Sequence, residues 1–289
     1  MKRRIRPQYL LLLPALITFF VLSLGPCLYA IALSFQNYNI QEYGQIGTFV
    51  GFQNYSDLLL HDEYFLTSLR VTIMIAFPSV LIEFILGILV ALLFAAEGIK
   101  GRRFLIPLLL IPNILADVVV GLVWLFMLQP TFGVLTQLMN SVGLFTGISP
   151  LAEPRLALPV VVVADVWQYT PFVALMLIAG ILSLPKDPVE SAQMDGASSF
   201  QIFRYVTLPA LRPLIVVAFL IRSIDLFRLF DKVWVLTGGG PGMATETVAV
   251  LAYRTNFRWW DLGYGSALVM MLYAIVLVYC VIFYSRLSK

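Results

Sequence analysis

Long runs of hydrophobic residues alternate with short polar segments along the 289 residues of the chain. A helix needs about 20 mostly apolar residues to cross ~30 Å of hydrocarbon, and six runs reach that length. The runs are continuous and lack the alternation of polar and apolar residues that is typical of a barrel strand. Because backbone groups in lipid must form their hydrogen bonds within the segment, the runs are expected to be helices. The pattern predicts an all-α membrane protein with six transmembrane helices at about Tyr9–Phe35, Val71–Ala96, Phe104–Leu128, Leu156–Leu184, Leu214–Leu236 and Gly265–Tyr284.

Composition supports a membrane location. The chain is 60% hydrophobic and only 12% charged, with a mean hydropathy of +0.91, whereas soluble domains carry about 25% charged residues. The apolar run after the basic start is longer than the roughly 7–15 residues of a signal peptide, so we expect a retained first helix. No linker divides the chain, which predicts one transmembrane domain over residues 1–289. Cys27 and Cys280 lie in separate predicted spans and indicate neither a disulfide framework nor a metal site.

The basic residues outside the spans set the expected orientation, because cytoplasmic loops are enriched in Lys and Arg. If both termini are cytoplasmic, the inside segments hold Lys2, Arg3, Arg4, Arg6, Lys100, Arg102, Arg103, Lys186, Arg204, Arg212, Arg286 and Lys289. The outside segments then hold Arg70, Arg155, Arg254 and Arg258. Twelve against four predicts that both termini face the cytoplasm.

A polar segment, "DPVESAQMDGASSFQIFRYVTLPALRP", separates the fourth and fifth predicted spans and falls on the cytoplasmic side. Asp187 is placed to cap a helix whose first turn contains Pro188, a sound helix start. Gly196 permits a tight turn after that helix. The segment 187–213 is therefore expected to begin with a short helix and a turn.

The second half of this segment predicts a short amphipathic helix, with Phe200, Phe203 and Val206 on one stripe and Pro209 ending it. An amphipathic loop on lipid headgroups is one interpretation. Such helices usually carry Lys or Arg on the polar face. Here that face is acidic or neutral except for Arg204, which favours a groove in a protein partner, and both interpretations stay open on these residues alone.

The stretch "ESAQMDGASSFQIFRYVTLP" resembles the "EAA" loop of binding-protein-dependent ABC importer permeases. The positions that match the motif at its spacing are Glu190, Ala192, Gly196, Leu208 and Pro209. Ser191 and Val206 depart mildly from it. In that family the loop docks in a cleft of the ATPase subunit and carries nucleotide-driven motion into the membrane. The resemblance implies an ATPase-coupling role for Glu190, Ala192, Asp195, Gly196, Ala197, Phe200, Leu208 and Pro209.

Two further stretches are similar to the carbohydrate-uptake branch of these permeases, which includes the first permeases of maltose, trehalose, polyol and glycoside systems. They are "DVWQYTPFVALMLIAGILSLPKDPVESAQMDGAS" and "FRLFDKVWVLTGGGPGMATETVAVLAYRTNF". The resemblance covers nearly the whole chain and implies the six-span core of a type I ABC importer permease. It also implies a bacterial-type plasma (inner) membrane and a carbohydrate-type solute.

No nucleotide-binding motif occurs in the chain, so ATP and Mg would be bound by partner ATPase subunits and no cofactor by this chain. The resemblance implies a second homologous permease, an ATPase dimer and an external solute-binding protein, all at a lipid bilayer. Nucleic acid is not an expected partner, and the chain itself is not expected to be an enzyme.

Ionisable groups at mid-membrane are costly and mark a pathway or a buried pair. Rise along each span places Glu83, Asn113, Asp117, Asp165, Gln168 and five groups of the fifth span near that depth. Arg222, Asp225, Arg228 and Asp231 recur every three residues with alternating sign, which fits either a ladder of intrahelical ion pairs or a polar path. Glu83 is expected to be structural. The expected substrate path comprises Asp117, Trp167, Gln168, Tyr169, Arg222, Asp225, Arg228 and Asp231.

The stretch "LTGGGPG" ends the fifth predicted span and forms a flexible or tightly turned outer loop before a short helix at Ala244–Phe257. The resemblance places binding-protein docking here, at Gly238, Gly239, Gly240 and Pro241. A sharp turn without a partner is the alternative.

Two other classes compete with the importer. An ion-coupled secondary transporter would use the charges of the fifth span, but inverted repeats and interrupted helices are not evident in the sequence. An intramembrane enzyme lacks support, because His61 is the only histidine and lies in an outer loop. The sequence does not specify the solute: a neutral sugar, disaccharide, polyol or glycosylated polyol is expected, with a glycerol-phosphate-type importer as runner-up.

Overall fold

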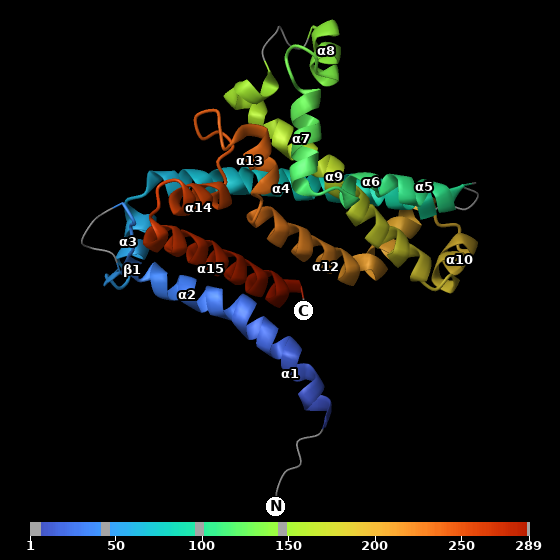
Figure 1. Cartoon of the computed structure of the whole chain (residues 1–289). Helices are drawn as coiled ribbons and strands as arrows, with labels where there is room; N and C mark the ends of the chain where they lie inside the picture. The colour runs from blue at the N-terminus through green and yellow to red at the C-terminus, as the bar shows by residue number, and fades with distance from the viewer. Residues whose placement is uncertain (1–6, 42–46, 96–100, 144–148, 288–289) are drawn as a thin grey trace, which may run out of the picture. The chain divides into compact units, whose positions relative to one another are not determined.

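A computed structural model describes residues 7–41, 47–95, 101–143 and 149–287 of the chain (Figure 1). Ala96, the expected end of the second span, and the basic residues Lys2, Arg3, Arg4, Arg6, Lys100 and Lys289 lie outside the described residues. The α-helices are α1 (Pro7–Phe19), α2 (Gly25–Ser34), α3 (Gln53–Leu60), α4 (Glu63–Ala95), α5 (Arg102–Leu109), α6 (Ile111–Ile114), α7 (Asp117–Met127), α8 (Val134–Ser141), α9 (Pro154–Ser183), α10 (Asp187–Met194), α11 (Ser199–Ile202), α12 (Leu208–Phe227), α13 (Asp231–Thr237), α14 (Val248–Phe257) and α15 (Leu262–Leu287). The other elements are the π-helices η1 (Phe20–Leu24) and η3 (Phe203–Thr207), the 3-10 helix η2 (Pro150–Ala152) and the strands β1 (Gln36–Asn37) and β2 (Thr48–Phe49).

Among the described residues, four helical stretches are long and apolar enough to cross a membrane. They are Leu12–Ser34, Glu63–Ala95, Pro154–Ser183 and Leu262–Ser285. A fifth candidate is the pair Arg102–Ile114 and Asp117–Met127, whose two parts bend by 90°. The 20-residue helix α12 is not among them, because it carries three charged residues, Arg212, Arg222 and Asp225.

The expected third and fifth spans are interrupted rather than continuous, which corrects the prediction of single helices there. Between α6 and α7, Leu115 and Ala116 are extended, with ψ angles of 139° and 145°. Between α12 and α13, Arg228–Phe230 leave the helical conformation. The helix after each break begins with an aspartate, where a negative charge meets the positive end of the helix dipole.

Contacts divide the chain into two compact units, and the first contains residues 1–66 and 251–275. Strands β1 and β2 pair antiparallel, with Gln36 opposite Phe49. Asn39 forms a β-bridge with Asp261 at the start of α15. The hydroxyl of Tyr264 donates a hydrogen bond to Asp62 Oδ2 at 2.6 Å. These contacts join the segments that follow α2 and precede α4 to the start of α15.

The second unit, residues 67–250 and 276–289, contains the candidate site. Its buried core is formed by apolar side chains of α4, α9, α12 and α13, including Val80, Val173, Ala218 and Val233. Helices α7 and α13, which follow the two breaks, pack side by side (Figure 1). Gly121 allows this approach, because a Cβ there would lie 2.9 Å from Val235 Cβ.

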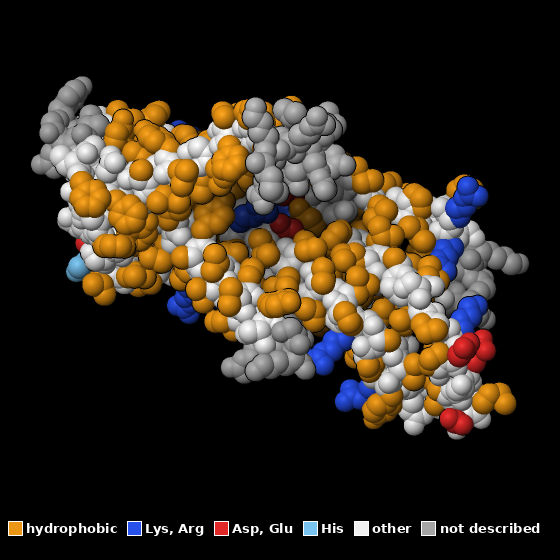
Figure 2. Space-filling model, turned by 90° about the horizontal axis from the view of Figure 1, so that it is seen from below, with side chains coloured by type: hydrophobic (Ala, Val, Ile, Leu, Met, Phe, Trp, Pro, Cys, Tyr) orange, Lys and Arg blue, Asp and Glu red, His pale blue; other side chains and the backbone are white. Residues whose placement is uncertain are grey.

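The exposed surface is largely hydrophobic, as expected for helices that face lipid. Leu22 is 70% exposed, Phe77 70% and Leu277 64%. Figure 2 shows hydrophobic side chains over most of the face drawn. Charged side chains gather at its right-hand end, on the side where Figure 1 places α5 and α10.

Proline explains the two π-helical stretches. Pro26 and Pro209 each lie two residues after the end of a π-helix, η1 and η3 respectively. A proline has no N–H, and its ring clashes with the carbonyl four residues earlier, which a wider turn relieves. Consequently the helix that starts at Ser199 continues through Pro209 into α12. The prediction that Pro209 ends this helix is wrong.

Candidate functional site

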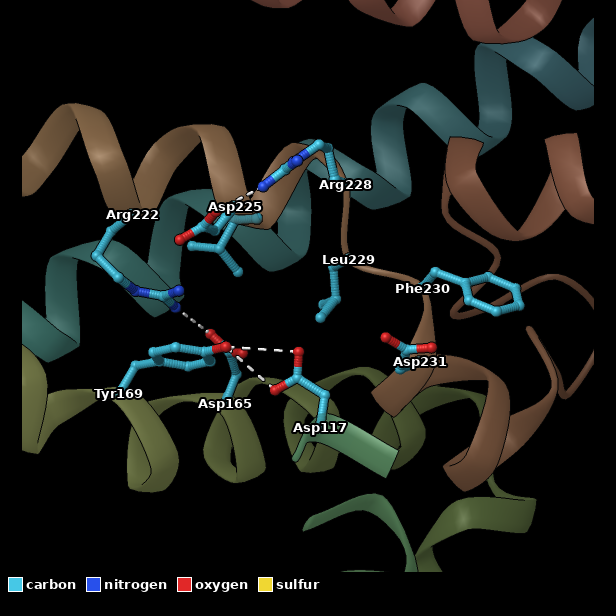
Figure 3. A pocket seen from close by; sticks show the side chains of 10 residues that line it. Asp117, Asp165, Tyr169, Arg222, Asp225, Arg228, Leu229, Phe230 and Asp231 are labelled. Carbon is cyan, nitrogen blue, oxygen red and sulfur yellow. Dashed lines mark hydrogen bonds and ion pairs between the residues drawn. The ribbon is translucent and has the colours of Figure 1, made fainter. Parts of the chain in front are cut away.

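A cavity of about 390 Å³ lies in the second unit among α7, α9, α12 and the break before α13 (Figure 3). Its lining is mostly ionisable, which is unusual within a bundle of apolar helices. The lining residues are Asp117, Asp165, Tyr169, Arg222, Asp225, Leu226, Arg228, Leu229, Phe230 and Asp231. Six of the eight residues expected in a substrate path are in this set.

Arg222 joins three helices at the floor of this cavity. Its Nε and one terminal nitrogen donate to the two carboxylate oxygens of Glu83 on α4, at 2.8 and 2.7 Å. The same terminal nitrogen donates to Asp165 Oδ2 on α9 at 2.8 Å. All three side chains are buried, with exposures of 0 to 2%. Burying charges is costly unless pairing and hydrogen bonding compensate, and this bidentate geometry provides both.

Lys232 completes the cluster from the first turn of α13. Its ammonium donates to Asp165 Oδ1 and lies 3.9 Å from Asp117 Oδ1, and the side chain is fully buried. By formal charge, Glu83 and Asp165 contribute two negative charges, and Arg222 and Lys232 contribute two positive charges. The buried cluster of these four residues is therefore neutral, so the charge of the cavity depends on the more exposed groups.

Tyr169 contacts this cluster at the wall of the cavity. Its hydroxyl donates to Asp117 Oδ1 at 3.1 Å. The guanidinium of Arg222 lies 3.6 Å from the centre of its ring, a cation–π contact. One face of the ring is thus occupied by a protein group. Tyr169 belongs to the cavity as expected, but as a partner of Arg222 and Asp117.

The charges of the fifth predicted span do not form a continuous intrahelical ladder. Within the described part of this span, Asp225 and Arg228 are the one pair that forms locally, at 2.9 Å, and both are substantially exposed to the cavity. Arg222 pairs across helices instead. Asp231 comes after the break, whereas Arg228 lies in it. Arg228 and Asp231 therefore do not share one helical face, although they are three residues apart. Asp231 is exposed and lines the cavity (Figure 3).

Trp167 and Gln168 do not line the cavity. Trp167 is 40% exposed and contacts Trp124 edge to face, with ring centres 6.2 Å apart. Gln168 is buried, and its Nε2 donates to the carbonyl oxygen of Leu115 at 3.0 Å. Leu115 belongs to the break between α6 and α7. The amide of Gln168 therefore stabilises the bend rather than facing the cavity.

Asp165 and Lys232 lie at the centre of the site although neither belongs to the expected path. The sequence signalled both residues only by their expected depth near the middle of the membrane. Glu83 lies at the same expected depth, and its buried ion pair with Arg222 fits the structural role expected for it. The partners of Arg222 are 139 and 57 residues away along the chain, so no local pattern could identify them.

The segment 187–213 forms a second candidate site. Helix α10 begins at Asp187 with Pro188 in its first turn, but Lys186 occupies the capping position, so Asp187 is not the cap. Gly196 has a φ of +79°, as the predicted turn requires. Ser198 and Gln201 then form a capping box at the start of α11.

The residues expected to couple to an ATPase lie mostly on the surface of this segment. Exposed members are Glu190, Asp195, Gly196, Phe200 and Pro209, and half-buried members are Ala192, Ala197 and Leu208. Large apolar side chains are exposed beside them, with Met194 at 89%, Phe200 at 69% and Tyr205 at 71%. Such a patch on a polar segment is suited to contact with another protein.

The glycine-rich loop after α13 is tightly turned. The hydroxyl oxygens of Thr237 and Thr245 lie 2.6 Å apart, and Thr245 Oγ1 lies 2.8 Å from the carbonyl oxygen of Gly240. Gly239 is buried, so its own surface is not available for docking. Gly238, Gly240 and Pro241 remain partly exposed. The helix after this loop is α14, which begins at Val248 and not at Ala244.

Comparison with known proteins identifies the family. The model of the family "Binding-protein-dependent transport system inner membrane component" matches residues 71–288, which include the cavity and the segment 187–213. The chain belongs to this family. It is a transport permease, and residues 187–213 are its EAA loop.

Relatives of this permease include several named for sugars. The trehalose/maltose transport system permease protein MalF of Thermococcus litoralis is 37% identical over 235 residues, 81% of this chain and 78% of that protein. The trehalose transport system permease protein SugA of Mycobacterium tuberculosis is 36% identical over 278 residues, 96% of this chain and 87% of that protein.

Among solved structures, a bacterial ABC transporter for import of the acidic polysaccharide alginate has the same fold. One of its chains aligns with a TM-score of 0.83 and 22% identity, over 97% of this permease and 94% of that chain. This permease itself has helices interrupted at Leu115–Ala116 and Arg228–Phe230. Interrupted helices therefore do not distinguish an importer permease from a secondary transporter.

Proposed function

We propose that this permease forms the translocation path for a neutral carbohydrate-type solute in an ATP-driven, binding-protein-dependent importer. The solute would be a sugar, disaccharide, polyol or glycosylated polyol. Family membership supports the importer, and the relatives named for trehalose and maltose support the solute class. The observation that carries the proposal for this chain is the ionisable cavity among apolar helices.

The charge of the cavity favours a neutral solute over an anionic one. Of the lining residues, Asp117, Asp165, Asp225 and Asp231 contribute −4 and Arg222 and Arg228 contribute +2, which gives −2; the buried Glu83 and Lys232 behind the lining add −1 and +1 and leave the sum unchanged. Carboxylates accept hydrogen bonds from solute hydroxyl groups, and Arg228 donates to solute oxygens. A phosphate would meet repulsion from this excess, which argues against the glycerol-phosphate alternative.

We propose six spans with both termini cytoplasmic, in a bacterial-type inner membrane. The four apolar helical stretches and the bent pair from Arg102 to Met127 supply up to five spans. Helix α12 would be the sixth, because its charged residues Arg222 and Asp225 face the cavity instead of lipid. The bias of basic residues toward one side supports the orientation.

We propose that the energy for transport comes from partner subunits, which would bind ATP and Mg. The exposed apolar side chains of the EAA loop would enter a groove of one ATPase subunit. A second related permease would complete the path, and an external solute-binding protein would dock at the loop Gly238–Pro241. ATP-driven approach of the ATPase subunits would then move α10 and α12, and with them the cavity.

Uptake into proteoliposomes tests the solute class. The complete importer is reconstituted with its binding protein, and ATP-dependent uptake of labelled trehalose, maltose and sorbitol is compared with that of glycerol 3-phosphate. We expect saturable uptake of at least one neutral solute and none of glycerol 3-phosphate. Uptake of glycerol 3-phosphate alone would reverse the proposed preference.

The variant Asp225→Ala tests the path in the same assay. It should impair uptake while the complex still assembles, because the side chain faces the cavity and its ion pair is with the exposed Arg228. The matched control is Asp57→Ala, which removes another locally paired carboxylate, 3.4 Å from His61, outside the cavity. Equal uptake by both variants and the wild type would leave Asp225 without a role in transport.

A further inference from the structure

The outer loop after α13 is tied to the rest of the second unit at its far end. Thr245, Glu246, Thr247 and Val248 are buried. The backbone N–H of Val248 donates to Thr72 Oγ1 on α4 at 3.0 Å. Within the loop, the N–H of Thr245 donates to the carbonyl oxygen of Gly239 at 3.2 Å. Because these bonds hold both ends of the segment, a displacement of the glycine turn also moves Thr245–Val248.

Thr247 connects this loop to the lining of the cavity. Its hydroxyl is fully buried and donates to the carbonyl oxygen of Leu229 at 2.8 Å. Leu229 lies in the break between α12 and α13, and it lines the cavity together with Arg228, Phe230 and Asp231. One hydrogen bond thus joins the outer loop to the middle of the break.

The break between α12 and α13 is the part of the cavity wall that can move most easily when the outer loop is displaced. Its residues lack the continuous helical hydrogen bonding that fixes the walls formed by α9 and α12. On the other side of the break, Lys232 is bound to Asp165 of α9. A pull at Leu229 would therefore turn Arg228–Phe230 between two anchored points.

We propose that Thr247 is a positioning residue that transmits binding-protein docking at the glycine loop to the cavity, through its hydrogen bond to Leu229. This inference rests on the proposed function, because it takes the outer loop as the docking site. The hydroxyl group is the part that acts, since it donates to Leu229 and also accepts from the N–H of Val250 at 3.3 Å.

Thr247→Val tests the proposal, because valine has nearly the same shape and lacks the hydroxyl. Thr247→Ser keeps the hydroxyl and serves as the conservative variant. Thr255→Val is the matched control, because Thr255 is also buried but its hydroxyl donates to Leu251 O within its own helix, at 2.9 Å. Each variant is purified as the complete importer with its ATPase subunits and placed in lipid nanodiscs.

The readouts are ATPase activity with and without the binding protein that the wild-type complex captures, and the affinity of that protein for each complex. For Thr247→Val we expect the ratio of stimulated to basal ATPase activity to fall about fivefold, a usual size for one residue of a coupled network. Docking affinity should change little. Thr247→Ser and Thr255→Val should keep the wild-type ratio.

If Thr247→Val keeps the wild-type ratio of stimulated to basal ATPase activity, the inference is overturned and the proposed function stays intact. The same holds if Thr247→Val and Thr255→Val lose stimulation equally, since that reports a general effect of a lost buried hydroxyl. If the wild-type complex captures neither ATPase nor binding protein, the proposed function fails and this inference fails with it.

Discussion

Asp165 is the residue on which the buried charges depend. It is the only carboxylate in the described part of the chain that contacts both Arg222 and Lys232. Glu83 balances Arg222 alone. Removal of the Asp165 charge would leave Lys232 buried, with Asp117 at 3.9 Å as its nearest remaining carboxylate. Breaking a buried pair in this way is costly because it leaves an uncompensated charge in a medium of low dielectric constant.

We therefore predict that Asp165→Asn destabilises the permease by about 3 kcal/mol. The double variant Asp165→Asn with Lys232→Met should recover much of that loss, because the remaining Glu83 and Arg222 are balanced. Asp225→Asn, which disrupts an exposed pair, should cost less than about 1 kcal/mol. Thermal unfolding of the purified complex in detergent measures all three. A double variant at least as unstable as Asp165→Asn would contradict the charge-balance argument.

Individual residues also show what the sequence could predict. Depth in the membrane identified Arg222, Asp165 and Lys232 as buried ionisable groups, because hydropathy makes each stand out. Their partners could not be assigned, since the contacts join helices far apart in the chain. Gln168 lies outside the cavity lining, because a polar side chain at this depth can equally satisfy a backbone carbonyl, here that of Leu115.

At the scale of elements, local signals succeeded where local geometry decides the structure. Gly196 supplies the left-handed turn between α10 and α11, as its place after the first short helix predicted. The breaks at Leu115–Ala116 and Arg228–Phe230 were missed, because each lies within a stretch that a continuous helix would explain equally well. Tertiary bonds from Gln168 and Thr247 stabilise these breaks, and no local motif encodes such bonds.

The turn at Gly196 gives a prediction for the EAA loop. Gly196→Leu should cost about 1–2 kcal/mol for the left-handed conformation and leave folding largely intact, because no atom of the described residues lies within 4 Å of an added Cβ. It should uncouple ATP hydrolysis from uptake by changing the surface that meets the ATPase. Uptake per ATP hydrolysed in proteoliposomes measures this coupling.

Gly101→Leu is the matched control for this variant. Gly101 also has a left-handed φ, +83°, and an added Cβ there would likewise meet no atom of the described residues within 4 Å. It lies at the start of α5, outside the EAA loop. Both variants carry the same backbone strain, so only Gly196→Leu should lose coupling. Normal transport by Gly196→Leu would refute the role assigned to the loop.

For the whole molecule, the membrane class and the helical fold followed from hydropathy, and the family followed from the EAA loop. The structural unit that holds the cavity could not be inferred in the same way. It depends on α4, α9, α12 and α13 meeting at one buried charge cluster, and on α7 packing against α13 at Gly121. These are long-range contacts whose geometry is set by packing.

The central claim is that this permease works as one subunit of an ATP-driven importer. Purification of the chain from its native membranes in mild detergent, with mass spectrometry of the proteins bound to it, tests that claim most directly. We predict that an ATPase subunit and a second six-span permease co-purify, and that Gly196→Leu retains both. A chain that purifies alone, or only with copies of itself, would contradict the account and direct attention to ion coupling at Asp225, Arg228 and Asp231.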